Sequence, residues 1–260
     1  MPSGHPHFGG KSLKCRHCGQ EEAIKNSHII PEWMYQDAYN DRGQLVPIMM
    51  DNRGKVEVMQ KGIREELLCP KCEVYLSVLE GYAKGFLVSV NSGKNPKVTL
   101  EPYSDRTNRI SGFDFQKVKK FILSLFYRAS ISKHPAFKSY DLGPYLHDIE
   151  DLVFNEAECT EQGFPVSITK MLVGPHETGL VMMTPPHKVE GKTFYSIYGF
   201  GFGFNLLVDA DYHGSFSSVF IKQDHMYIQK RNLNDEDLSE RFLRRMLEDD
   251  VQRFYRRKSG

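Results

Sequence analysis

Residues 67–73 read Leu-Leu-Cys-Pro-Lys-Cys-Glu, and residues 15–19 read Cys-Arg-His-Cys-Gly. In each stretch two residues separate a pair of cysteines, a spacing that lets both thiolates face one tetrahedral ion from a tight turn. A glycine tolerates such a turn, and a proline is favoured at the start of a helix. Because four of the five cysteines fall in these pairs, the sequence predicts a closed, structural Zn2+ site formed by Cys15, Cys18, Cys69 and Cys72. The alternatives are a redox pair or thiols that are close in sequence by coincidence.

The 50 residues between the two pairs are more than a simple zinc ribbon requires. Residues 44–50 and 55–60 are strand-like, and turn-forming residues join them, so we expect a hairpin there. After the second pair, Leu76, Leu79 and Ala83 recur at helical spacing. A knuckle, a hairpin and a helix that carries the second ligand pair, in this order, predict a zinc treble clef.

Between the cysteine pairs lies His28-Ile29-Ile30-Pro31, and a leucine precedes Cys69. With these motifs in this order, roughly residues 13–84 resemble the zinc-stabilised branch of the HNH, or His-Me finger, endonucleases. The resemblance implies a ββα-metal-like fold, with His28 in the position of the general base and one divalent cation, Mg2+ or Mn2+, at the reacting phosphate. It also implies nucleic acid, with DNA favoured, as the substrate, and hydrolysis of phosphodiester bonds as the reaction.

The chemistry of histidine suits this role. A neutral imidazole, with an ordinary pKa of ~6.5, can take a proton from water at neutral pH, and the hydroxide can then attack a phosphodiester. A divalent cation would neutralise charge on the phosphate and on the leaving oxygen. His28 precedes two isoleucines, however, so a purely structural histidine is the alternative.

Three positions depart from the pattern of the family. Ser27 stands where an Asp or a His ligates the catalytic metal, Arg64 stands where an Asn is expected, and Glu73 replaces the Asn or His after the last cysteine. Carboxylates are good ligands for hard cations, so Glu73, with Glu80 two helical turns on, could supply a different set of catalytic metal ligands. Alternatively, Glu73 merely complements a helix dipole, and the chain is an inactive zinc module that binds nucleic acid or a protein partner.

The composition excludes several classes of protein. Thirty-four basic against 33 acidic residues give a net charge of +1, which excludes a strongly basic nucleic-acid-binding chain. No apolar run approaches the ~20 residues of a membrane span, and the first residues lack the apolar stretch of a signal peptide, so we expect a cytoplasmic protein without membrane contact. Residues 1–84 contain 11 Lys+Arg and 11 Asp+Glu. A nuclease module of this charge would need a cation and basic residues from elsewhere to attract phosphate.

Beyond residue 84 the sequence changes character. We expect a strand, a turn and a strand over 85–100, and then a helix over 113–132 whose apolar stripe is core and whose lysines form a solvated face. A shorter helix is expected over 142–155. Strand-like segments that predict a largely antiparallel sheet follow at 165–173, 179–183, 193–198, 203–208 and 217–221.

Two later segments carry further predictions. The run of alternating aromatic residues and glycines over 198–204 predicts a strand edge rather than a phosphate-binding loop, because strands and not a helix flank it. A last helix is expected over 235–257, with an apolar stripe spaced for packing against the body of the protein: Leu238, Phe242, Met246 and Phe254. Six arginines make this helix the most cationic segment of the chain, although acidic residues dilute it.

Together these patterns predict an α+β protein with two domains. Residues 1–84 form the HNH-like zinc module, and residues 85–260 form an α+β domain with a helical segment, a mainly antiparallel sheet and a C-terminal helix. We expect a metal-dependent endonuclease whose C-terminal domain selects the substrate or a protein partner. By analogy with other HNH-like modules, a bacterial defence or mobile-element system is the expected setting. A third hypothesis makes the sheet itself an enzyme or a small-molecule sensor.

Overall fold

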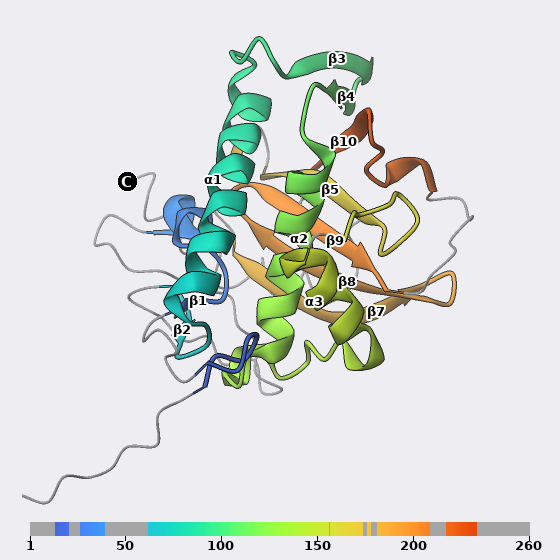
Figure 1. Ribbon diagram of the computed structural model, residues 1–260. Coiled ribbons are helices and arrows are strands. Elements are labelled where there is room, and N and C mark those ends of the chain that lie inside the picture. The colour runs from blue at the N-terminus through green and yellow to red at the C-terminus, as the bar shows by residue number, and fades with distance from the viewer. Residues whose placement is uncertain are drawn as a thin grey trace, which may run out of the picture.

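In the computed structural model of the 260-residue chain, the described residues are 14–20, 27–39, 62–155, 157–173, 176–177, 181–208 and 217–232. This part of the chain is an α+β protein with three α-helices and a mainly antiparallel sheet, as the sequence predicts (Figure 1). None of its helices is long and apolar enough to span a membrane. The predicted hairpin over 44–60 and the predicted helix over 235–257 lie outside the described residues.

Eight strands form the main sheet, in the spatial order β3-β4-β10-β5-β9-β8-β7, with β6 paired to β5. Neighbouring strands are antiparallel except β10 and β5, which are parallel. Strand β10, the last of the described strands in sequence, therefore lies between β4 and β5. The strands are β3 (Thr99–Ser104), β4 (Thr107–Ser111), β5 (Val166–Val173), β6 (His176–Glu177), β7 (Met182–Val189), β8 (Lys192–Gly199), β9 (Phe202–Leu207) and β10 (His225–Asn232).

Helix α2 (Phe115–Ile131) is the central helix of the fold. It contacts strands β8 and β9 as well as helices α1 (Pro70–Ser92) and α3 (Leu146–Phe154). Its residues are buried on nearly every face, which is typical of a helix enclosed by other elements. Phe121, for example, meets the ring of Phe204 on β9 edge-on at 6.0 Å between centroids.

A small second sheet lies near the start of α1. Strand β1 (Ser27–His28) pairs antiparallel with β2 (Arg64–Glu65), so that His28 lies opposite Arg64. Short 3-10 helices complete the described elements: η1 (Glu32–Ala38), which follows β1, η2 (Pro135–Phe137), η3 (Gly143–Tyr145) and η4 (Ser217–Val219).

Trp33 of η1 links this N-terminal part to the main sheet. Its ring stacks on Phe121 at 5.9 Å between centroids and meets Phe200 edge-on at 5.2 Å. Phe200 and Gly201 both have positive φ, 54° and 72°, so they form a tight two-residue turn between β8 and β9. The N–H of Phe200 donates to the carbonyl of Met34 (3.0 Å). The run of aromatic residues and glycines is therefore a hairpin between two strands, and its turn packs on η1.

The predicted strand, turn and strand over 85–100 is wrong in its first half. Helix α1 runs through this stretch because Phe86, Leu87 and Val90 extend its buried face. It ends at Gly93, whose φ of 63° forms a left-handed C-cap. Helix α1 therefore crosses the predicted domain boundary, and buried residues from both sides of that boundary belong to one core cluster.

One expected strand is absent from the described residues, and one strand that was not expected is present. Residues 217–219 form the 3-10 helix η4, where a strand was expected. Strand β10 was not expected, although Met226 and Ile228 are buried and alternate with more exposed residues. This alternation is the sequence signal that could have revealed the strand.

The expectation that the lysines of α2 form a solvated face is wrong for Lys119, which is 1% exposed; Arg128 on the same helix is 0% exposed. The Nζ of Lys119 donates to the carbonyls of Thr160 and Gly163. Burial lowers the pKa of Lys119 to about 8. These carbonyls take the place of water around the buried ammonium group.

Candidate functional site

The local backbone brings the four paired cysteines to one point. In the first pair, the N–H of Gly19 donates to the carbonyl of Cys15 (3.0 Å), and a φ of 72° at Gly19 lets the chain turn back. In the second pair, Cys69 is the N-cap residue of α1, Pro70 begins the helix and Cys72 lies in its first turn. A turn and a helix start therefore each present two thiols.

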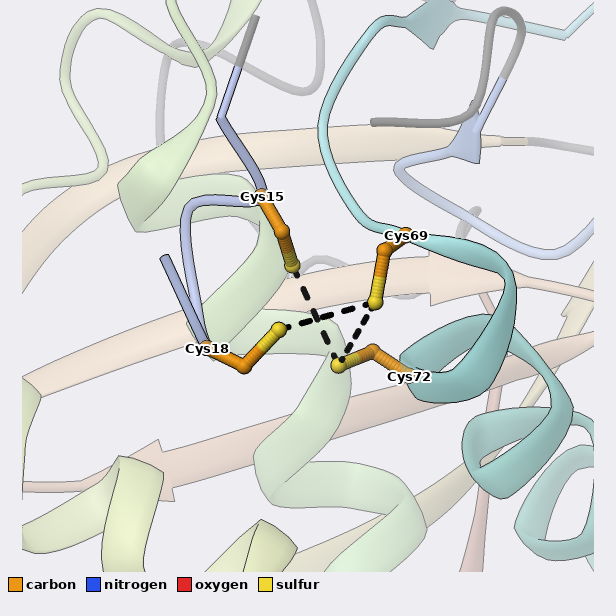
Figure 2. A group of neighbouring side chains, drawn as sticks. All are labelled: Cys15, Cys18, Cys69 and Cys72. Atoms are coloured by element: carbon orange, nitrogen blue, oxygen red, sulfur yellow. Dashed lines mark hydrogen bonds between the residues drawn. The ribbon is translucent and has the colours of Figure 1, made fainter. Parts of the chain in front are cut away.

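Figure 2 shows these four thiols converging. All four Sγ atoms lie within 4.8 Å of one another. The Sγ atoms of Cys69 and Cys72 are 3.5 Å apart, those of Cys18 and Cys69 3.6 Å, and those of Cys15 and Cys72 3.9 Å. Zn–S bonds of ~2.3 Å in a tetrahedron place the sulfurs ~3.8 Å apart. The cluster is therefore positioned to hold a metal ion and fits Zn2+, as predicted.

In the absence of a cation, each thiol of this cluster affects the ionisation of its neighbours. Burial, together with the neighbouring thiols, raises the pKa of Cys72 far above its ordinary value. At Cys69 burial also opposes ionisation, but hydrogen bonds from the backbone and thiol of Cys72 and from the other thiols lower the pKa to about 7. One thiolate is thus stabilised at the expense of its neighbours. A divalent ion removes the conflict because it binds all four as thiolates.

His28 belongs to a second polar group, which we name the His28 site: His28, Glu32, Tyr39 and Arg64. The Nε2 of His28 is 3.0 Å from Oε2 of Glu32, and Nη2 of Arg64 is 3.4 Å from the same oxygen. The hydroxyl of Tyr39 donates to Oε1 of Glu32. The side chains of His28, Glu32 and Arg64 are 28%, 37% and 32% exposed, so solvent reaches the site.

The charges of the His28 site decide its protonation. Burial lowers the pKa of His28, and Arg64 lowers it further, whereas Glu32 raises it; the pKa remains below its ordinary value. At Glu32 burial opposes ionisation, but the hydrogen bond from Tyr39 and the charges of His28 and Arg64 lower the pKa. The imidazole is therefore neutral at pH 7 beside an anionic carboxylate. Because a carboxylate can only accept, Nε2 carries the proton and Nδ1 is the unprotonated nitrogen.

Arg128 connects the His28 site to the helices. Its Nη1 donates to the main-chain carbonyl of His28 (3.0 Å) and to Oε1 of Glu80 on α1 (2.7 Å). Its Nε donates to the carbonyl of Ser124 one turn earlier in α2 (3.3 Å). The side chains of Arg128 and Glu80 are 1% and 21% exposed. One largely buried ion pair thus holds β1, α1 and α2 together.

The other predicted site residues have separate surroundings. Ser27 is buried, and its Oγ accepts the N–H of Leu68 (3.3 Å). Glu73 follows Cys72 in the first turn of α1, and its Oε1 is buried without a hydrogen-bond partner among the described residues. In the described part of the chain the cysteine cluster is the one group of three or more His, Cys, Asp or Glu side chains that could hold an ion. Neither Glu73 nor Glu80 therefore forms such a group with His28, although the charge of Glu80 raises the pKa of His28.

Sequence reasoning missed Glu32, Tyr39 and Arg128. Glu32 had a signal, because it follows His28 by four residues. Arg128 also had one, because it continues the apolar stripe of α2 from Leu125 at helical spacing. Tyr39 had none, since it follows η1, whose first residue is Glu32, and its contact with Glu32 depends on the 3-10 geometry of that helix.

Comparisons with protein-family models, curated proteins and solved structures found no match to this chain. What the chain does must therefore be inferred from the cysteine cluster and the His28 site.

Proposed function

We propose that this chain is an endonuclease of the HNH type, built on a zinc treble clef with a ββα-metal-like core. The observation that carries the proposal is the position of His28. It lies on β1, its partner strand β2 follows, and α1 then begins inside the cysteine cluster. The order β1, β2, α1 agrees with the order of the HNH-like motifs in the sequence.

In this proposal His28 is the general base. Glu32 accepts a hydrogen bond from Nε2–H, so Nδ1 accepts the proton from a water molecule. The resulting hydroxide attacks the phosphorus of a phosphodiester, the bond from phosphorus to the leaving sugar oxygen breaks, and that oxygen takes a proton from solvent. When the ring becomes an imidazolium, the carboxylate of Glu32, 3.0 Å from Nε2, stabilises its charge. The lowered pKa keeps the imidazole neutral at pH 7, which is the form that a base needs.

The two metals of the prediction differ in how well the residues fit them. Zn2+ would be held by the four cysteines and would fix the turn and the helix beside His28; it supplies stability and no reactive group. For Mg2+ or Mn2+ the fit is poor, because Glu80 is paired with Arg128 and Glu73 is not grouped with His28. A catalytic cation bound through Glu73 or Glu80 stays a prediction, and we assign no reaction step to it.

The charge of the module limits how it can bind DNA. Residues 1–84 carry equal numbers of acidic and basic residues, and four thiolates around one Zn2+ add a net charge of −2. Affinity for a phosphate backbone depends on Lys and Arg contacts. Basic residues outside the module, such as the arginines over 235–257, would therefore have to contact the nucleic acid. A protein partner on the C-terminal part and a role in bacterial defence or a mobile element remain parts of the proposal.

A cleavage assay tests the proposed function. Supercoiled plasmid and single-stranded DNA are incubated with the zinc-loaded chain in Mg2+ or Mn2+, and His28→Ala is compared with wild type. Removing a general base should slow cleavage about 10²–10⁴-fold. His225→Ala is the matched control, because His225 is also paired with a carboxylate, that of Asp224 (2.8 Å). Equal cleavage by His28→Ala and wild type, or no cleavage under any of these conditions, contradicts the proposal.

A second candidate function is an inactive zinc module that binds nucleic acid or a protein. The observation in its favour concerns Ser27, which stands at the family's metal-ligand position. Its side chain is buried, and its hydroxyl accepts a hydrogen bond from the N–H of Leu68. Fluorescence anisotropy with labelled DNA separates the two. Binding that survives in His28→Ala, without cleavage by either protein, supports the binding module.

A further inference from the structure

Arg64 is the cross-strand partner of His28. The two residues lie directly opposite each other in the pairing of β1 with β2. Side chains of directly opposed residues leave the same face of a sheet, with Cβ atoms ~4.5–5.5 Å apart. Burial and, next, the charge of Arg64 lower the pKa of His28, so the guanidinium acts on the ring. The two strands therefore place a fixed positive charge beside the imidazole.

The guanidinium of Arg64 has donors to spare. An arginine carries five N–H donors. In the part of the chain that the structure describes, the side chain of Arg64 makes a single hydrogen bond, from Nη2 to Oε2 of Glu32 (3.4 Å). Its Nε is buried, and no described atom accepts its N–H. A buried donor without a partner destabilises a protein, so stability alone does not explain an arginine in this place.

The carboxylates near His28 are already engaged with protein donors. Oε1 of Glu32 accepts the hydroxyl of Tyr39, and Oε2 faces both His28 and Arg64. Glu80 belongs to an ion pair of its own. A cation such as Mg2+ needs oxygen ligands in near-octahedral geometry, and a guanidinium repels it. Among the described residues, this set of side chains does not fit the Mg2+ or Mn2+ that the family implies.

We propose that Arg64 supplies the positive charge that a divalent cation supplies in the family, so that His28 and Arg64 cleave a phosphodiester without Mg2+ or Mn2+. This inference rests on the proposed function. When hydroxide attacks phosphorus, negative charge on the phosphate oxygens must be stabilised, and arginines can do this. The guanidinium fork matches the geometry of phosphate and forms strong, charge-assisted hydrogen bonds. It stays cationic while the neighbouring ring is neutral.

The link between Arg64 and Glu32 leaves room for this contact. Its length of 3.4 Å exceeds the ~2.7–2.9 Å of a strong charge-assisted bond. The two side chains are 32% and 37% exposed, and ion pairs that solvent reaches are weak. The same carboxylate accepts Nε2–H of His28, so Glu32 orients both the base and the guanidinium. A phosphate can therefore bind the remaining donors of Arg64 without releasing the base.

Cleavage in the absence of divalent cations tests the proposal. The full chain, loaded with zinc and washed free of the excess, is incubated with supercoiled plasmid in buffer passed over a chelating resin. Elemental analysis establishes that zinc stays bound and that Mg2+ and Mn2+ are absent. Wild type should cleave as fast as with added Mg2+, and His28→Ala should not cleave. Cleavage that needs added Mg2+ or Mn2+ and is lost in His28→Ala would overturn the role of Arg64 and leave the proposed function in place. No cleavage under any condition would overturn both.

Substitution of Arg64 tests its role directly. Without divalent cations, Arg64→Met should lower kcat about 10²–10³-fold, the usual cost of losing one donor to the transition state, with a smaller effect on KM. Rates are compared well above pH ~6.5, where His28 is neutral in both proteins. Arg109→Met is the matched control and should cleave like wild type. Arg109 is also a strand arginine bonded to a carboxylate, that of Glu101 (3.2 Å), and it is 33% exposed. Unchanged kcat in Arg64→Met would overturn the proposal.

A binding measurement gives a readout that does not depend on turnover. Dimethyl phosphate, a small phosphodiester, is titrated into the zinc-loaded chain while NMR follows the ring of His28. The ring signals should shift in wild type and in Arg109→Met but not in Arg64→Met. The zinc content and melting temperature of each variant establish that it is folded, and Arg64→Lys, which keeps the charge without the fork, should give an intermediate shift. Equal shifts in wild type and Arg64→Met would overturn the proposal.

Discussion

The cysteine cluster and the His28 site both lie close to the first turns of α1, but different forces hold them together. The cluster consists of four equal donors with sulfurs 3.5–3.9 Å apart, and it needs a cation that the chain does not supply. The His28 site contains its own opposite charges: Glu32 faces His28 and Arg64, and nearby Glu80 faces Arg128. The first is thus positioned to hold a metal ion, and the second can form from protein groups alone.

Disrupting the cysteine cluster should also have a different effect on the other centre than disrupting the His28 site. The hydroxyl of Ser27 on β1 accepts a hydrogen bond from the N–H of Leu68, one residue before Cys69, so the cysteine cluster supports the strand that carries His28. The reverse dependence is weak, because no residue of the His28 site contributes a ligand to the cluster. Breaking the cluster should therefore disrupt both centres, whereas breaking the His28 site should leave the metal bound.

The largest effect is expected from Cys72→Ser. A structural Zn2+ contributes roughly 10–16 kcal/mol in small zinc domains, as much as the whole stability of many proteins. Elemental analysis should find one zinc ion per wild-type chain and almost none in the variant. The N-terminal module of the variant should also unfold. Cys159→Ala is the control: Cys159 is buried but outside the cluster, so zinc should stay and the loss of stability should be about 1–2 kcal/mol. Zinc retained by Cys72→Ser would contradict the four-cysteine site.

The next largest effect concerns the ion pair between Arg128 and Glu80, next to the His28 site. Arg128→Met leaves Glu80 and the His28 carbonyl without their shared donor, which should cost about 3–5 kcal/mol in chemical denaturation. The double variant with Glu80→Gln should recover part of this loss, because no unpaired charge then remains. Both variants should keep one zinc per chain. Loss of zinc in Arg128→Met would show that the two centres are not independent in this direction.

A smaller effect is expected at the link between the centres. Ser27→Ala removes the hydroxyl that accepts the N–H of Leu68, and that N–H is left without its acceptor at a buried position. The expected loss is about 1–3 kcal/mol. Thermal melts with and without a chelator measure it. If the hydroxyl joins the two centres, Ser27→Ala should be less stable than wild type when both are zinc-loaded. This difference in stability should shrink after the metal is removed from both proteins.

The smallest effect is a pair of opposite shifts in the pKa of His28, measured by NMR titration of its ring. Glu32→Gln removes the carboxylate that raises this pKa and should lower it further, whereas Arg64→Met should raise it. The folded pKa lies below the unfolded value of ~6.5. The neutral ring therefore contributes fully to stability above pH ~6.5, and this contribution is lost as the pH falls through the folded pKa. Shifts of the same sign in both variants would contradict the charge arrangement.

The two centres also differ in how far the sequence could predict them. All four ligands of the cluster come from two local pairs whose spacing implies their geometry, so sequence reasoning found every one. His28 was found through a motif, but its partners come from η1, β2 and α2, which meet through tertiary packing. Glu73 was chosen because it follows the last cysteine, and Glu80 because it lies two helical turns on. The sequence could not predict that Arg128, 48 residues beyond Glu80, would pair with the carboxylate of Glu80.

The fold shows the same contrast between local and distant information. The central helix and most strands of the sheet follow from apolar periodicity. The misassigned residues 85–92 are glycine- and valine-containing and have weak helix preference, yet the core contacts of Phe86 and Val90 keep them helical. Buried Lys119 was assigned to a solvated face because a charge pattern does not reveal which carbonyls will meet it.

Strand β10 has a consequence for the order in which the molecule can fold. In the described sheet it alone connects the β3–β4 ribbon with the remaining strands, and it pairs with residues 107–111 and 166–173. During synthesis the cysteine pairs, α1 and α2 are available long before residues 225–232 leave the ribosome. Until then the sheet consists of two separate parts with open edges, which are prone to wrong pairing. Closure of the sheet is therefore a late event that depends on contacts distant in sequence, and such contacts form slowly.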